Sequence, residues 1–287
     1  MKKRTIAKTG ATMLTMAMLL NGTTVFAAAG TNYGTTIEGT KTTTFDKYLV
    51  MDTQANVPNA TFTYAVTAGT AKDYDVAGKK FQVLAGVDAD KITMAGVGGT
   101  AAAANTIVFQ GDGSDTHDTT KAAYVKDLAT GKKAALKTAT LDFSKVQFTE
   151  PGVYRYIITE GGTNQAITND ADLTRVLDVY VNDASTTDTD GNLIKKLTIA
   201  GYVLHSNEND EPDVAAGENF GSAGSYTDKK SQGFTNSYDT SDLTLRKEVT
   251  GNQASRDKYF EFTLNIDKAQ PNTKYDVVIA DADATSK

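Results

Sequence analysis

The order of apolar and polar residues along the chain predicts many short β-strands. The clearest strand follows a Pro-Gly turn at Pro151, and alternation places Tyr154, Tyr156 and Ile158 on one of its faces. Glu160 ends that same face. An isolated carboxylate on a buried face is energetically costly, so either the strand ends where Glu160 reaches water, or Glu160 has a function inside the core.

Apolar runs and turn residues elsewhere predict further strands, with long Gly- and Ala-rich loops between residues 67 and 140. In chain order, these strands are Thr44–Met51, Ala60–Val66, Phe81–Val87, Thr106–Phe109, Ala139–Phe148, Leu173–Asn182, Leu193–Leu204 and Gly233–Tyr238. Ala122–Ala135 is compatible with a short helix. Many short strands, sparse helix and recurring turns predict an all-β chain, with a β-sandwich domain over residues 41–240.

Two later segments repeat the patterns of the first two strands. Leu243–Gly251 resembles Phe45–Val50, and Tyr259–Leu264 resembles Thr61–Val66. We therefore expect the start of a second β-sandwich over residues 242–287. Two or three strands cannot close a core, so we expect this second domain to be truncated, as part of a longer protein.

The N-terminus has the layout of a secretory signal peptide. A basic start, Met1–Arg4, precedes a short apolar stretch, Ala11–Leu20, and then small residues suited to cleavage. We expect a signal peptide over residues 1–29 and a flexible, polar leader over residues 30–40. No later stretch is long and apolar enough to span a bilayer, which predicts a secreted chain.

Charge and cysteine content narrow the functional classes. The net charge is −6, with Lys and Asp interspersed, so nothing in the composition favours nucleic acid or an anionic membrane as a partner. The chain contains no cysteine. A secreted protein without cysteine has no disulfides, so any covalent staple must be of another kind.

Three polar residues share the parity of core-facing hydrophobic residues. In the first predicted strand, Lys47 has the parity of Leu49. In the last, Asn236 has the parity of Phe234. With Glu160, this places an amine, an amide and a carboxylate toward the core, where each would be costly alone and where they can satisfy one another.

Their chemistry is complementary. Burial disfavours charge, so a buried Lys47–Glu160 pair can approach neutrality by sharing a proton, which makes the amine a nucleophile. A protonated Glu160 can polarise the Asn236 carbonyl group and pass protons to departing ammonia. The product is an intramolecular isopeptide bond from Lys47 to Asn236, with Glu160 as the catalytic proton shuttle.

Each residue also has an ordinary explanation when it is taken alone. Lys47 can extend its amine to water, Asn236 can cap a turn, and Glu160 can lie at a strand end. The shared parity of all three in a cysteine-free secreted chain favours the cross-link. The repeat adds weight, because Lys247 again has the parity of its apolar neighbour Leu245.

Five segments resemble those of a known family, both in their residues and in their order along the chain. They are Phe45–Leu49, Val57–Tyr64, Leu141–Phe148, Pro151–Glu160 and Phe234–Ser237. Together they resemble the streptococcal pilin FctA family, the major backbone pilins of Gram-positive pili that sortases assemble. The resemblance covers most of residues 41–266 and is weakest over residues 67–138.

The resemblance implies tandem Ig-like (CnaB-type) sandwiches, each with a Lys–Asn isopeptide bond and an adjacent catalytic glutamate. These roles fall on Lys47, Asn236 and Glu160, and Lys247 would be the lysine of the second bond, with its partners in the missing part. For the lysine that sortase joins to the next subunit, Lys229 matches best and Lys230 is the alternative, although both could be ordinary solvated lysines. The chain departs from the family in having no LPxTG-like sorting signal, which we attribute to truncation.

Other chemistries have little support in the sequence. A cluster of Asp112, Asp115, His117 and Asp118 and a turn starting at Asp188 resemble parts of a calcium site, but the bidentate glutamate is missing. We therefore expect no metal and no cofactor. With two histidines and no nucleophile motif, a hydrolase triad is not supported, and the predicted protein is no enzyme beyond its own cross-linking.

These observations predict a structural subunit, a major or backbone pilin, of a covalently polymerised pilus on the cell surface. Its expected partners are other pilin subunits and a pilus sortase, with a host surface ligand as a further option. It would be secreted by its signal peptide and anchored to the cell wall as part of the pilus. The alternative is a wall-anchored adhesin or minor surface protein that uses stapled Ig-like domains to bind host protein or glycan.

Overall fold

A computed structural model describes most of the region between residues 37 and 240. The described residues are 37–76, 79–99, 101–113, 115, 128–161, 167–210, 212, 230–240, 243, 245–248, 250 and 260–266. The expected signal peptide lies outside them. The end of the expected flexible leader is instead a short strand, β1 (Ile37–Gly39), which pairs in parallel with a strand starting at Leu197 and buries Ile37.

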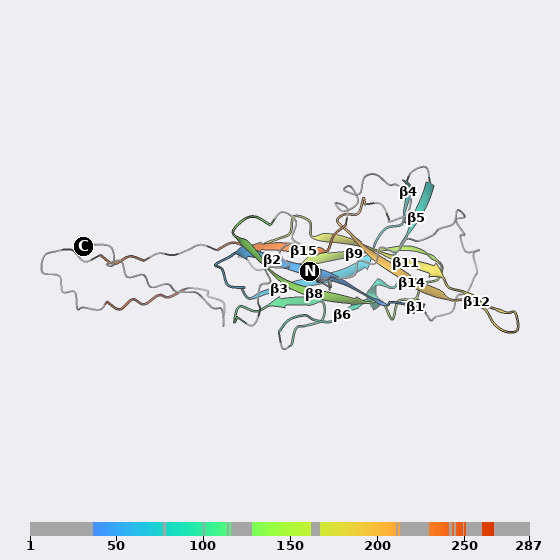
Figure 1. The fold of residues 1–287 in the computed structure, drawn as a ribbon, viewed down its shortest axis with the longest axis horizontal. Coiled ribbons are helices and arrows are strands. Elements are labelled where there is room, and N and C mark those ends of the chain that lie inside the picture. Colours follow the sequence, from blue (N-terminus) through green and yellow to red (C-terminus); the bar gives the residue numbers. More distant parts are fainter. Residues whose placement is uncertain are drawn as a thin grey trace, which may run out of the picture.

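Two sheets lie face to face and form a sandwich (Figure 1). The larger has eight strands, namely β1, β3 (Ala60–Ala68), β4 (Lys72–Val76), β5 (Lys79–Ala85), β7 (Thr106–Phe109), β9 (Gly152–Gly161), β11 (Thr174–Asp183) and β14 (Leu197–His205). The smaller has five, in the order β10 (Ile167–Thr168), β15 (Gly233–Tyr238), β2 (Thr42–Asp52), β8 (Lys132–Asp142) and β6 (Thr93–Met94). A separate hairpin joins β12 (Thr186–Thr187) to β13 (Leu193–Ile194), and a 3-10 turn, η1, spans Ala89–Lys91. The predicted all-β, Ig-like sandwich is thereby confirmed.

Side chains from both sheets fill one apolar core. Phe45 of β2 packs on Tyr64 of β3 with ring centroids 5.1 Å apart. Phe143, just after β8, meets Tyr156 of β9 at 5.4 Å. These aromatic contacts join the sheets across the interior, and burial of such rings supplies much of the hydrophobic stabilisation.

The first and last long strands of this domain are neighbours. β15 pairs in parallel with β2, with Phe234 opposite Lys47 and Ser237 opposite Val50. Gly233 opens β15 at φ +150°, and a Cβ there would lie 1.7 Å from the carbonyl oxygen of Asp46. Glycine is therefore required for β15 to approach β2 so closely.

The predicted strands near residues 47, 63, 83, 107, 178 and 236 are confirmed, and three details are corrected. The strand expected at Ala139–Phe148 ends at Asp142 and begins at Lys132. The short helix over Ala122–Ala135 is therefore wrong where it can be checked, because Lys132–Ala135 pairs with β2, and tertiary pairing overrides local helix preference; residues 122–127 lie outside the described part. The strand expected at Leu193–Leu204 is divided, since residues 195 and 196 belong to neither β13 nor β14.

The described residues beyond 240 form no strand. Several of their apolar side chains are exposed, among them Leu243 (69%) and Phe262 (62%). A strand needs a backbone partner and an apolar face needs a cover, and the described residues of this segment supply neither. The second sandwich therefore stays a prediction. Within the described part of the chain, no helix is long and apolar enough to cross a membrane.

Candidate cross-linking site

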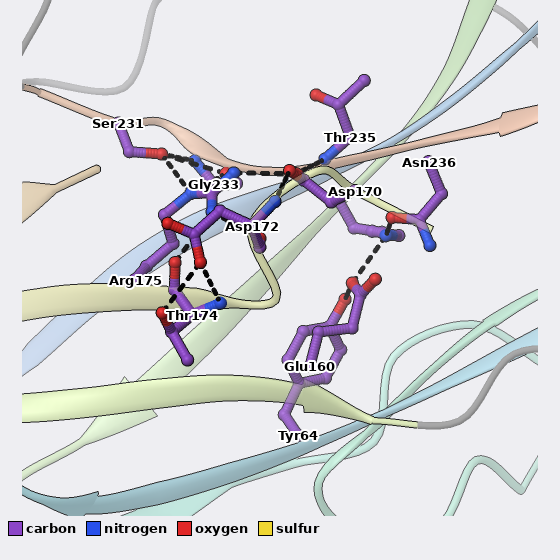
Figure 2. A network of polar contacts seen from close by, with 11 residues as sticks. Tyr64, Glu160, Asp170, Asp172, Thr174, Arg175, Ser231, Gly233, Thr235 and Asn236 are labelled. Carbon is purple, nitrogen blue, oxygen red and sulfur yellow. Dashed lines mark hydrogen bonds and ion pairs between the residues drawn. The ribbon is translucent and has the colours of Figure 1, made fainter. Parts of the chain in front are cut away.

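Three strands bring Lys47, Glu160 and Asn236 together in the core. Lys47 comes from β2, Glu160 from β9 and Asn236 from β15, and their exposed fractions are 0%, 1% and 1%. Lys47 Nζ donates to Glu160 Oε2 at 2.5 Å and also to Asn236 Oδ1 (Figure 2). The structure thus places the three residues as their parity predicted, across sequence separations of 113 and 189 residues.

Aromatic rings enclose this polar group. Lys47 Nζ lies 4.0 Å from the centroid of the Phe62 ring, and the rings of Phe45, Tyr64 and Phe234 pack on one another beside it. The face of an aromatic ring attracts a cation, and the rings also exclude water. The amine therefore lies in a dry environment, enclosed by aromatic rings.

Tyr64 is part of the site, although sequence reasoning did not single it out. Its hydroxyl donates to Glu160 Oε2 at 2.8 Å. Burial, together with the nearby Glu160 charge, raises the pKa of Tyr64, so the hydroxyl stays protonated and remains a donor. Its parity with buried Phe62 in β3 was the available signal, since a tyrosine on a core face needs a polar partner.

Burial lowers the pKa of Lys47 to about 8, against the opposing pull of the Glu160 carboxylate. An unperturbed lysine has a pKa near 10.4, so at pH 7 only about one amine in 2,500 is neutral. With a pKa of about 8, the neutral fraction is about one in ten. The site therefore increases the population of the neutral, nucleophilic amine at pH 7.

Two polar atoms of the site have no hydrogen-bond partner. They are Glu160 Oε1 and the amide nitrogen of Asn236, Nδ2. A buried unpaired polar group costs about 1–3 kcal/mol, so their presence calls for a reason. Glu160 Oε1 is free to accept and donate a proton. Asn236 Nδ2 is the atom that would leave as ammonia if Lys47 attacked the amide carbon. Departure of Nδ2 would remove one of the two unpaired groups.

A second polar network holds the backbone of β15 next to this site. Asp170 Oδ2 accepts from the Thr235 amide at 2.6 Å and from Arg175 Nη2 at 2.7 Å (Figure 2). Arg175 Nε donates to the carbonyl oxygen of Gly233 at 2.8 Å, and the guanidinium group lies 4.7 Å from the Phe234 ring centroid. Sequence reasoning missed both residues: Asp170 precedes the strand and carries no alternation signal, whereas the parity of Arg175 with Leu177 in β11 was available and was not used.

The other predicted site residues stand apart from this cluster. Lys229 lies outside the described residues, whereas Lys230 is partly buried and forms a β-bridge with His205. Lys247 is exposed, with Nζ 5.1 Å from the Phe260 ring centroid. The structure therefore does not bring Lys230 or Lys247 to the core site.

The residues considered for calcium have other contacts. Asp115 forms an ion pair with Lys137 at 2.6 Å, and Asp188 accepts from the backbone amides of Asp190 and Asn192 within its own turn. His117 and Asp118 lie outside the described part, within which no group of three or more potential metal ligands occurs.

Comparisons with known families match most of the chain. The family described as "Spy0128-like isopeptide containing domain" matches residues 93–239, and a domain of unknown function, DUF7601, matches residues 241–287. The boundary between the two matches falls just after β15.

Similar proteins come from Streptococcus pyogenes. A protein named "Pilin" from serotype M1 is 27% identical over 253 residues, which is 87% of this chain and 57% of the relative. The crystal structure of a major pilin from the same species is 20% identical over 77% of this chain and 58% of that one, with a TM-score of 0.41. The T-13 major pilin is 20% identical over 75% of this chain and 60% of that one, with a TM-score of 0.35. The chain thus spans under two thirds of each.

Proposed function

The chain belongs to the Spy0128-like isopeptide containing domain family, and from this premise we propose that it is a structural subunit of a cell-surface pilus, stabilised by its own isopeptide bond between Lys47 and Asn236. The observation that carries the proposal is the buried contact of Lys47 Nζ with both Glu160 and Asn236. The amine, the amide and the proton carrier lie on three different strands, and no simpler role accounts for all three in one apolar core.

The bond would form in a balanced exchange. Glu160 takes a proton from Lys47 Nζ, and the neutral amine attacks Cγ of Asn236. As the Nζ–Cγ bond forms, Glu160 gives this proton to Nδ2 and takes the second proton from Nζ. The Cγ–Nδ2 bond breaks, ammonia leaves, and Glu160 remains protonated beside the new amide. No external reagent is consumed. Fixed placement of the reacting groups can supply roughly 7–11 kcal/mol of the barrier.

The rate of bond formation is expected to rise with pH. Only the neutral amine attacks, and the pKa of Lys47 is about 8, so the rate should increase from pH 6 to pH 8 and level off above it. The measurement starts with unlinked chain recovered from inclusion bodies, refolded at each pH and followed by intact mass. A rate that falls over this range would contradict an attacking amine with this pKa.

The position of the bond suits a fibre subunit. β2 and β15 are the first and last long strands of the domain, so a pull along the chain would load them first. A covalent bond between them would stop the domain from extending. Support for the pilus role also comes from the relative named "Pilin", and from the expected signal peptide, which would deliver the subunit to the surface.

Polymerisation would require an acceptor lysine for sortase. We expect Lys229→Arg to abolish SDS-resistant ladders of the full-length protein in cells that carry the pilus sortase, because arginine keeps the charge but offers no attacking amine. Lys230→Arg is the matched neighbour and should leave the ladders intact. If both variants polymerise normally, neither is the acceptor, and if only Lys230→Arg fails, the acceptor is Lys230.

A further inference from the structure

We propose that Asp170 and Arg175 are positioning residues for isopeptide-bond formation, which hold the strand of Asn236 in register with the amine and the acid. The inference rests on the proposed cross-link. The two side chains do not touch the reacting atoms, and they act through the backbone of β15.

We call the side chains of Asp170 and Arg175 together the clamp. The clamp takes the place of a neighbouring strand along the first half of β15. On the side away from β2, β15 pairs with β10 only at Ser237 and Tyr238. The earlier backbone groups of β15 on that side are bonded by side chains instead: Asp170 accepts from the Thr235 amide, and Arg175 donates to the Gly233 carbonyl oxygen. The half of β15 that precedes Asn236 is therefore bonded on one side to the backbone of β2 and on the other side to the side chains of Asp170 and Arg175.

The clamp also connects the two sheets at the site. Arg175 lies on β11, which pairs with β9, so that Arg175 is opposite Ile158, and the Glu160 amide donates to the carbonyl oxygen of Leu173 at 2.8 Å. Arg175 and Asp170 form an ion pair at 2.7 Å with side chains only 10% exposed. The strand that carries the amide is thereby fixed to the strands that carry and support the acid.

Register matters here because strand faces alternate. A shift of β15 by one residue would turn the Asn236 side chain out of the core and move the neighbouring residue in. Smaller displacements also matter, since an error of about 1 Å in a reacting group can cost about 100-fold in rate. A clamp within one residue of Asn236 is well placed to prevent both.

The test compares rates of bond formation in refolding chains, counted from the time at which tyrosine fluorescence reaches its folded value. Arg175→Lys keeps the positive charge but lacks the planar guanidinium group, whose separate nitrogens donate to Gly233, Ser231 and Asp170 in fixed directions. We expect it to form the bond about 10- to 100-fold more slowly. Asp170→Ala should slow the reaction similarly, and Asp170→Asn, which keeps an acceptor for the Thr235 amide, should restore part of the rate.

Arg155→Lys is the matched control. Arg155 is also a buried arginine of the same sheet and pairs with Asp178 at 2.7 Å, and its hydrogen bonds to other described residues go to Tyr74 and to the carbonyl oxygens of Glu208 and Asp210, not to β15. It should form the bond at the wild-type rate. If it slows the reaction as much as Arg175→Lys, the effect is one of general packing and the proposal is overturned.

A second measurement tests the placement of β15 separately from the rate of bond formation. In an Asn236→Ala background, which cannot form the bond, Arg175→Lys should speed hydrogen exchange over residues 233–238, whereas Arg155→Lys should not. If Arg175→Lys and Asp170→Ala form the bond at the wild-type rate, the positioning role of the clamp is overturned, whereas the cross-link itself is not. A wild-type chain of full calculated mass instead overturns the cross-link itself, so the two failures are distinguishable.

Discussion

Glu160→Gln is expected to keep the full calculated mass of its sequence, whereas the unchanged chain is expected to be lighter than calculated by about 17 Da, one ammonia. Glutamine has nearly the same size and still offers an oxygen to Lys47 and Tyr64, so the site should keep its packing. It cannot take the proton from Nζ or return it to the leaving nitrogen. General acid–base catalysis contributes about 10²- to 10⁴-fold, so the bond should be absent on the time scale of expression and purification.

Intact-mass spectrometry of the two folded proteins decides the outcome, followed by a digest to find the Lys47–Asn236 branched peptide. Glu38→Gln is the control, because Glu38 also pairs with a lysine, Lys196 at 2.8 Å, but at an exposed position. That variant should show the same mass deficit as wild type. A full mass in the wild type would refute the cross-link, and a deficit in Glu160→Gln would refute the role of the acid.

Sequence reasoning could find Lys47, Glu160 and Asn236 because strand parity is a local property. Lys47 and Asn236 each lie in a short run whose alternation is unambiguous, and β15 has the predicted bounds. A polar residue in core parity is conspicuous, since it violates the pattern around it. The pairing of β2 with β15 then follows from the need of each polar group for a partner.

Sequence reasoning could not find the residues that depend on tertiary neighbours. By alternation Arg155 lies on the face of β9 opposite Tyr154 and Tyr156, yet it is buried, because Tyr74 of β4 and the turn carbonyl oxygens of Glu208 and Asp210 cover it. Its partner Asp178 lies on the adjacent strand. Whether an outward-facing charge reaches water depends on which loops fold over the sheet, and alternation carries no information on that point.

The boundaries of β8 were missed for a related reason. Lys132–Ala135 favours a helix by local composition, but each of its residues has a backbone partner in β2. A continuous ladder satisfies these backbone groups in the sheet, and that gain outweighs a preference of tenths of a kcal/mol per residue. Local preference therefore fails at the point where a long partner strand is available.

Removing the bond is expected to lower stability more than removing any single surface ion pair. Asn236→Ala cannot form the bond but leaves Lys47 paired with Glu160. The bond would close a loop between residues 189 apart, for which the chain-entropy treatment of a covalent cross-link gives about 5 kcal/mol. For a domain of this size, that corresponds to a fall of about 10–20 °C in Tm.

Lys47→Met separates the covalent effect from the ionic one. It also prevents the bond, and in addition it leaves the Glu160 carboxylate buried without its cation, at a further cost of about 3–5 kcal/mol. Adding Glu160→Gln to Lys47→Met removes that charge and should recover most of this second loss. The expected order of Tm is therefore wild type, then Asn236→Ala, then the double variant close to it, then Lys47→Met.

Thermal unfolding followed by circular dichroism measures this order, and protease resistance should follow it. Lys196→Met is the control, since it breaks the exposed ion pair with Glu38 and should cost no more than about 1 kcal/mol. If Asn236→Ala unfolds at the wild-type temperature, the bond does not stabilise the domain, even where mass spectrometry detects it. A bond between β2 and β15 would also keep the domain from extending under load, so its loss should lower resistance to stretching, which is the property that a fibre subunit needs.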